Sequence, residues 1–193
     1  MGLTLITGPT VEPLTLAEAR DQLRIDGEDE DTLLAGLIQA AREWAEAFTR
    51  RALITQTWEL VLNTWPTGDR FSLPLPPLQS VTSIKYTDID GDEATFSSAS
   101  YIADTDHTPG RIVLKNGYSW PAVTLREVSG IRVRFVAGYG AAAADTPQVI
   151  RQAMLLVVGH LYENREDTVA TGNLRTIPLG AEMLAWNRRV MAF

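Results

Sequence analysis

Cysteine is absent from the 193 residues of this sequence, and histidine is nearly so, with only His107 and His160. Without cysteine there can be no disulfide bond, no thiolate metal site and no cysteine nucleophile. The sequence also lacks a Gly-x-Ser-x-Gly motif, so the nucleophile elbow of a Ser–His–Asp hydrolase is missing. These absences exclude chemistry based on cysteine and disfavour a Ser–His–Asp site, so we predict no catalytic residues of either kind.

Positive charge is also scarce. Lysine and arginine together number 17 against 24 acidic residues, which gives a formal net charge of -7, and only Lys85 and Lys115 are lysines. Proteins that wrap nucleic acid need clustered cations, so this balance argues against tight DNA binding. It remains compatible with DNA that slides past the protein without sticking. Arginine suits interfaces and carboxylate pairs, although GC-rich coding sequence would give the same bias.

Long apolar runs are missing as well. The longest, residues 153–159, is far shorter than the ~20 residues that cross a bilayer, so we expect no membrane association. A hydrophobic content of 45% nevertheless suits a globular protein. The chain is long enough for one substantial core or for two small lobes that share one.

Helical patterns mark both ends of the chain. Thr15 and Glu18 have the spacing of a capping box, which predicts a helix start. A wide apolar stripe with helical spacing then predicts a second helix. The stripe comprises Leu33, Leu34, Leu37, Ile38, Ala41, Trp44, Ala45 and Phe48. Towards the C-terminus, Thr146-Pro147 predicts the start of a third helix that runs to about residue 165. A last helix is predicted over residues 181–191.

The middle of the chain has strand patterns instead. Residues 80–86 and 131–136 alternate in side-chain character, and Asp90-Gly91 is a strong signal for a hairpin turn. Several short strands at this spacing indicate a small antiparallel sandwich or barrel. We therefore predict an α+β fold, in which residues 1–52 and 141–193 form a helical core. Residues 53–140 would be a β-rich lobe inserted into it.

Two acidic loops invite a metal-binding interpretation. Residues 88–93 contain alternating aspartates, but the twelfth position of a calcium loop starting at Asp88 is Ala99 instead of glutamate. A hairpin turn explains these residues better. Residues 26–31 precede a predicted helix, where carboxylates favour the positive end of the helix dipole.

Several segments, in this order, resemble the head–tail connector proteins of tailed phages. They are LTLAEAR (14–20), LRID (23–26), AREWAE (41–46), RALITQTW (51–58), PPLQSVTSIK (76–85), VRFVAGYG (133–140), LYENRE (161–166) and IPLG (177–180). No single segment is diagnostic, but their order is fairly specific and spans nearly the whole chain. Related adaptors occur in gene transfer agents, the phage-like particles of some bacteria.

The resemblance implies a structural, non-enzymatic protein without a cofactor. It implies a homo-oligomeric ring of about a dozen copies that joins portal to tail or stopper proteins. DNA would pass through the lumen without sequence-specific binding. The ring would lie in the neck of a virion or phage-like particle and be assembled in the bacterial cytoplasm.

Candidate interface residues lie in the last two predicted helices. The third helix is apolar all round over residues 154–158, which is unusual for a free surface, and Trp and Arg commonly anchor interfaces. The candidates are Leu156, His160, Tyr162, Arg165, Trp186, Arg188, Arg189 and Phe193. The alternative is that the last helix folds back on the second or third helix of its own chain.

Two other functions remain open from the residues. A virion-associated polysaccharide hydrolase would need paired carboxylates beside a cleft, whereas the carboxylates here fall in loops and caps. A carbohydrate-binding β module could stack sugars on Trp58, Trp65 and Trp120, although their places near strands and proline turns favour core positions.

Overall fold

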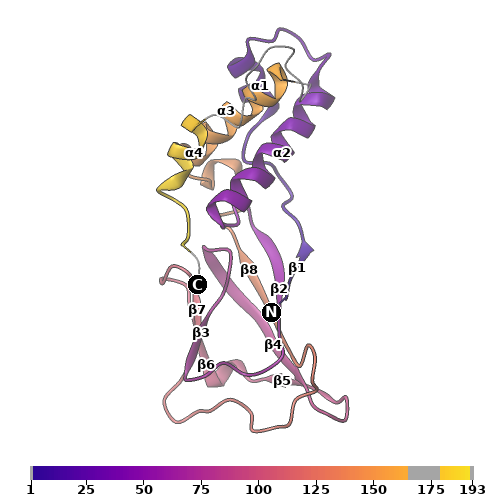
Figure 1. The fold of residues 1–193 in the computed structure, drawn as a ribbon, viewed down its shortest axis with the longest axis vertical. Coiled ribbons are helices and arrows are strands. Elements are labelled where there is room, and N and C mark those ends of the chain that lie inside the picture. The colour runs from indigo at the N-terminus through magenta and orange to yellow at the C-terminus, as the bar shows by residue number, and fades with distance from the viewer. Residues whose placement is uncertain (1, 165–178, 192–193) are drawn as a thin grey trace, which may run out of the picture. The chain divides into compact units, whose positions relative to one another are not determined.

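The chain divides into two compact units in the computed structural model, which describes residues 2–164 and 179–191 (Figure 1). One unit is made of residues 1–9 and 55–139 and holds all the described strands. The other is made of residues 10–54 and 140–193 and holds the described α-helices. None of the described helices is both long and apolar enough to cross a bilayer. The α+β class predicted from the sequence is confirmed.

The β unit contains two antiparallel sheets. The larger has five strands in the order β1 (Gly2–Thr7), β2 (Gln56–Leu62), β8 (Ile131–Ala137), β4 (Leu78–Thr87) and β5 (Glu93–Phe96). The smaller has three strands in the order β3 (Arg70–Ser72), β7 (Arg111–Leu114) and β6 (Tyr101–Asp104). A short 3-10 turn, η1 (Ser98–Ser100), joins β5 to β6.

The core of the β unit follows from strand alternation. Ile131, Val133 and Phe135 of β8 are fully buried, while Arg132 and Arg134 point to the opposite face. Aromatic rings from both sheets and their loops meet in one cluster. It comprises Trp65, Phe71, Tyr86, Phe96, Tyr101 and Trp120.

The hairpin predicted at Asp90-Gly91 is confirmed. Strands β4 and β5 pair with Thr87 opposite Glu93 next to the turn and Ile84 opposite Phe96 at the far end. The Asp88 carboxylate accepts hydrogen bonds from the backbone N–H groups of Asp90 and Asp92, at 3.0 and 2.9 Å. This acidic loop therefore uses its first carboxylate to close a turn. Within residues 2–164 and 179–191, no cluster of three or more His, Asp or Glu side chains could hold a metal ion.

The helical unit consists of α1 (Leu16–Leu23), α2 (Asp31–Thr49), α3 (Gln148–Glu163) and α4 (Leu179–Trp186), with a 3-10 turn, η2 (Ala143–Asp145), before α3. The predicted capping box is present, because Thr15 and Glu18 bond to each other's backbone N–H groups. The helices bury a shared core. Its members include Leu34, Ile38, Ala41, Ala45, Ile150, Ala153, Met154, Val157, Ala181 and Ala185.

Three expectations need correction. Residues 2–7, assigned to the helical core, form β1 in the other unit, because their partner β2 lies some fifty residues along the chain and no local pattern announces it. The last helix ends at Trp186, where the chain turns so that the Val190 N–H bonds to the Thr49 carbonyl at 2.9 Å. The stripe on α2 is only partly core, because Arg42 and Thr49 are buried on this helix whereas Leu33 is exposed.

Candidate assembly surface

An aromatic and cationic cluster covers the junction of α2 and α4. Trp44 and Phe48 of α2 are stacked, with ring centroids 5.4 Å apart. The ring of Trp186 on α4 lies 6.3 Å from that of Phe48. The Arg189 guanidinium sits 5.2 Å from the Phe48 ring centre and 5.3 Å from that of Trp186. Such contacts are worth about 0.5–1 kcal/mol each at exposed positions, so they hold the cluster in place without hiding it.

Large apolar side chains extend this cluster along α4. The helix turns its small residues, Ala181 and Ala185, towards α3 and α2, and presents its large ones to solvent. Leu179 and Met183 are each 73% exposed and Trp186 is 54% exposed. Together with Glu182 and Asn187 these three line a shallow groove of about 330 Å³.

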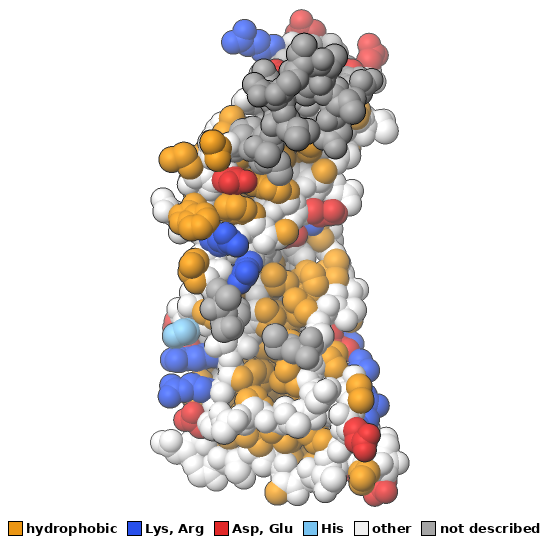
Figure 2. Space-filling model, in the orientation of Figure 1, with side chains coloured by type: hydrophobic (Ala, Val, Ile, Leu, Met, Phe, Trp, Pro, Cys, Tyr) orange, Lys and Arg blue, Asp and Glu red, His pale blue; other side chains and the backbone are white. Residues whose placement is uncertain are grey.

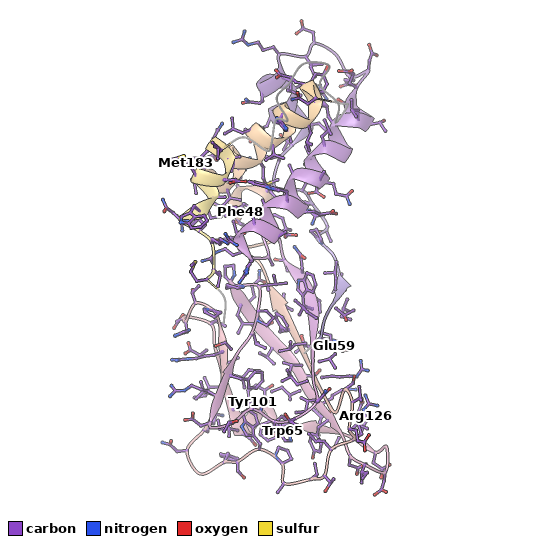
Figure 3. The ribbon with its side chains drawn as sticks, in the orientation of Figure 1. Phe48, Glu59, Trp65, Tyr101, Arg126 and Met183 are labelled. Carbon is purple, nitrogen blue, oxygen red and sulfur yellow. The ribbon has the colours of Figure 1, made fainter. Side chains whose placement is uncertain are left out.

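We call the combined surface of Trp44, Phe48, Leu179, Met183, Trp186 and Arg189 the α2–α4 surface. Figure 2 shows hydrophobic side chains gathered over α4, and Figure 3 marks Met183 and Phe48 in this region. A contiguous exposed apolar patch with an arginine beside it is typical of a binding surface. The small, buried face of α4 packs on the other helices of its own chain, and the large apolar side chains on the opposite face remain exposed to solvent.

The structure separates the candidate interface residues predicted from the sequence. Trp186 and Arg189 belong to the α2–α4 surface. Leu156 is half-buried on α3 and lies against Gly180, so it helps to seat α4. The side chain of Arg188 is exposed, and its backbone carbonyl accepts a hydrogen bond from Arg51 Nε at 2.5 Å. Arg165 and Phe193 lie outside the described residues.

The two candidates at the end of α3 make local contacts. The hydroxyl of Tyr162 donates a hydrogen bond to the carboxylate of Glu30, at the start of α2. His160 Nδ1 is 3.4 Å from the side-chain amide of Asn164, which also donates to the His160 carbonyl at 2.8 Å. Both rings are half-buried. They fasten the end of α3 within the unit, and any role at an interface stays a prediction.

Sequence reasoning missed Trp44 and Phe48 as members of the surface. Both fit the apolar stripe of α2, a pattern that indicates core positions, but they are half-buried. Periodicity shows which residues share a helix face. It does not show how far along that face the neighbouring helices extend.

A charged cluster occupies the outer face of the five-stranded sheet. The Glu59 carboxylate on β2 accepts hydrogen bonds from Arg132 Nη1 at 2.7 Å and from Arg134 Nη2 at 2.8 Å, both on β8 (Figure 3). Lys85 and Glu93 pair beside them at 2.6 Å, and Ser83 completes the lining of a polar pocket of about 240 Å³.

The electrostatics of Glu59 argue against an acid–base role. Burial would raise the pKa of this carboxyl, but the hydrogen bonds and charges of Arg132 and Arg134 outweigh it, so the pKa lies below its usual range. A carboxyl of this kind stays ionised at neutral pH. It is therefore a poor proton donor and fits a structural ion cluster better than a hydrolase site.

Glu59→Gln is expected to lower the free energy of unfolding by about 1–2 kcal/mol at pH 7. Because the folded pKa is depressed, the stabilisation is fully present above the unfolded pKa of ~4.3 and is lost as the pH falls through the folded pKa. The gap between wild type and variant in urea melts should therefore shrink towards pH 3. Glu93→Gln is the matched control, since its ion pair is about half exposed and its loss should be under ~0.5 kcal/mol. A gap independent of pH would contradict the assignment.

The tryptophans do not form an open platform for sugars. Trp65 and Trp120 are stacked on each other, with centroids 5.1 Å apart and planes 9° apart. The Trp120 indole N–H donates to the Gly68 carbonyl at 2.8 Å, and Trp58 lies within β2, opposite Phe135 of β8. These rings are half-buried packing groups. The carbohydrate-binding alternative is therefore not supported.

The described residues thus present an exposed apolar surface on the helical unit and an ion cluster on the five-stranded sheet. The family of phage gp6-like head-tail connector proteins matches residues 13–106. Sequences of curated proteins give no match.

Solved structures match the whole chain. A chain from the neck of an empty gene transfer agent particle, computed with C6 symmetry, is 29% identical with a TM-score of 0.83. One from the virion of a native gene transfer agent particle is 27% identical with a TM-score of 0.81. One from the neck of a native particle, computed with C12 symmetry, is 28% identical with a TM-score of 0.79. Each match covers 100% of this chain and 97% of the other.

The chain is similar to head–tail connector proteins over residues 13–106 and to neck and virion chains over its whole length, which supports the role of a structural connector. The resemblance inferred from the sequence is confirmed.

Proposed function

We propose that the protein is the adaptor ring in the neck of a tailed phage or gene transfer agent particle, between portal and tail. The observation that carries this proposal is the match along the full chain, at 27–29% identity, to chains from particles described as gene transfer agents, two of them from necks. Both units are included in that match, so the likeness is not limited to a common small fold.

The neck of a native particle was computed with C12 symmetry, which supports a ring of about twelve copies for this chain. Closed rings of identical chains use one interface between two different surface patches, repeated around the axis. The ring would hold no cofactor and catalyse no reaction. It would assemble in the bacterial cytoplasm, and no membrane is involved.

DNA in transit is the third partner of such a ring. The net charge of -7 disfavours phosphate binding, because DNA is held by clustered lysine and arginine. A channel that repels DNA lets it pass during packaging and ejection without being retained. The contacts with DNA would therefore be independent of sequence and weak.

The α2–α4 surface is the place where we expect the helical unit to dock on the portal or on a tail-side partner. It combines exposed leucine, methionine and tryptophan side chains with the Arg189 guanidinium. These residue types give adaptable apolar contact and strong anchoring at interfaces.

Deleting the gene from a particle-producing cell tests the proposal directly. Filled heads and tails should then accumulate unjoined, and electron microscopy of lysates would count them. Supplying the wild-type chain from a plasmid should restore joined particles, which controls for effects on neighbouring genes. Joined particles at the wild-type level in the deletion strain would refute the adaptor role.

A further inference from the structure

Strand β1 is an open and unprotected edge of the five-stranded sheet. It pairs with β2 on one side, and on its other side it has no strand partner among the described residues. All six residues are exposed. Leu3, Leu5 and Ile6 are exposed by 38%, 45% and 42%. An edge of this kind offers unpaired backbone N–H and C=O groups to any strand that reaches it.

Natural sheets protect such edges with charges, prolines or bulges, and β1 has little of this protection. Its sequence, GLTLIT, contains no charged residue and no proline. Its register is regular from Gly2 to Leu5, and the one irregularity falls between Leu5 and Thr7, at the end of the strand. The opposite edge is different. Strand β5 has four residues and carries Glu93, which is paired with Lys85. Because β1 lacks the charged side chain that β5 carries, β1 is the edge more open to pairing with another strand.

The charge of the chain indicates which partner fits β1. Two copies of this protein each carry a net charge of -7 and repel one another over most of their surfaces. The first eleven residues contain no charged side chain, so β1 is a place where two copies can meet without that penalty. Main-chain hydrogen bonds and the exposed leucines would supply the attraction.

We propose that β1 of one copy adds to the β5 edge of the next copy, so that the sheets are continuous between neighbours in the ring. Neighbouring strands in the sheet are all antiparallel, and β5 is four steps from β1, so the two edges run in the same direction. Copies that are related by rotation about a ring axis would therefore join in parallel. Pairing of β1 with β1 would give a closed two-fold dimer instead. The inference rests on the ring of the proposed function.

The absence of cysteine from the sequence makes cross-linking a clean test. The strand registers place Thr4, Glu93 and Thr95 on the same face of the sheet. Thr4→Cys combined with either Glu93→Cys or Thr95→Cys should form disulfide ladders between copies on mild oxidation, because the two edges would bring their Cβ atoms within disulfide reach. The two β5 positions cover both registers that put a residue opposite Thr4. The experiment uses purified rings and rings bound to heads.

Each outcome decides between specific possibilities. Ladders from a double variant, with none from the single variants, support the proposal. Dimers from Thr4→Cys alone would show the two-fold pairing and overturn it. Rings without any cross-link would overturn the β1 contact while leaving the adaptor role intact. If no ring forms in either preparation, both the ring and this contact fail.

A charge placed on the edge gives an independent measure. Leu5→Lys should lower the fraction of protein in rings by roughly tenfold, because the charge would have to be desolvated in the contact. The control is Val128→Lys, an apolar and 67% exposed position in the loop before β8, the central strand of the sheet, and so on neither edge strand. Sedimentation would report ring content, and circular dichroism would confirm that both variants are folded. Equal ring content in the two variants would contradict the role of β1.

Discussion

Particles that carry Met183→Lys and Trp186→Ala together are expected to join heads to tails at least about a hundredfold less often than wild type. A buried interface tryptophan is typically worth 2 kcal/mol or more, and burying a lysine charge in place of methionine adds to that loss. A sum near 3 kcal/mol corresponds to roughly a hundredfold change in affinity. The measurement is the count of joined particles, with binding of the purified variant to portal-containing heads as a second readout.

The fold should survive these two changes. Both side chains point away from the core of the helical unit, with 73% and 54% of their surfaces exposed. The buried face of α4, Ala181 and Ala185, is untouched. Loss of the Trp186 ring removes its contacts with Phe48 and Arg189, which should lower stability by about 0.5–1.5 kcal/mol. Truncating the whole helix would be less informative, because the buried alanines would go with it.

Val128→Lys is a suitable control, since Val128 is 67% exposed and belongs to the other unit. It should join heads and tails normally. Wild-type joining by the Met183 and Trp186 double variant would exclude this surface from docking. Early melting of that variant would show instead that the outward face of α4 stabilises the chain.

Local signals in the sequence were sufficient for much of the fold. The Thr15 capping box and the Asp90-Gly91 hairpin depend on residues a few positions apart, so the printed sequence contains all that is needed to predict them. The alternation of buried and charged residues in β8 is equally local.

The parts that the sequence did not reveal depend on distant partners. Residues 2–7 form a strand because they pair with β2. Their own sequence alternates only weakly in side-chain character, so it does not predict that pairing. Whether Trp44 and Phe48 are core depends on where α4 lies, which is set by contacts far along the chain. The small alanine face of α4 could be recognised only once its neighbours were known. Docking surfaces are difficult to predict for the same reason, since they are the faces that remain after internal packing.

Arg42 is a third residue whose environment the sequence did not indicate, and its replacement should have the largest effect on stability. It does not belong to the apolar stripe of α2, yet it is only 8% exposed. Its Nε lies 2.8 Å from a Glu12 carboxylate oxygen and its Nη1 lies 3.0 Å from Glu46. The second oxygen of Glu46 accepts the backbone N–H of Leu53 at 2.9 Å. Burial would lower the pKa of Arg42, but the two glutamates outweigh it and raise the pKa.

This network fastens the two places where the chain enters and leaves the first part of the helical unit. Glu12 follows the crossing after residue 9, and Leu53 precedes the crossing after residue 54. One guanidinium on α2 therefore holds both segments to the helix. Arg42 bonds to the side chains of Glu12 and Glu46, and Glu46 in turn bonds to the backbone of Leu53. Loss of the arginine should therefore loosen the segments around Glu12 and Leu53 together.

Arg42→Ala is expected to lower the free energy of unfolding by about 3–5 kcal/mol, because it removes one partner from a largely buried ion cluster. Urea denaturation of the purified chain at pH 7 would measure the change. Arg42→Lys keeps the charge but not the fork of donors, so an intermediate loss is expected.

Arg42→Met with Glu46→Gln should recover part of the loss, since it removes a carboxylate along with its partner and keeps an oxygen for the Leu53 N–H. If Arg42→Ala changes stability by less than ~1 kcal/mol, the cluster does not hold these segments. If the double variant is no more stable than Arg42→Ala, the lost packing of the arginine stem is not the cause, because methionine restores it, and the unpaired Glu12 carboxylate accounts for the loss.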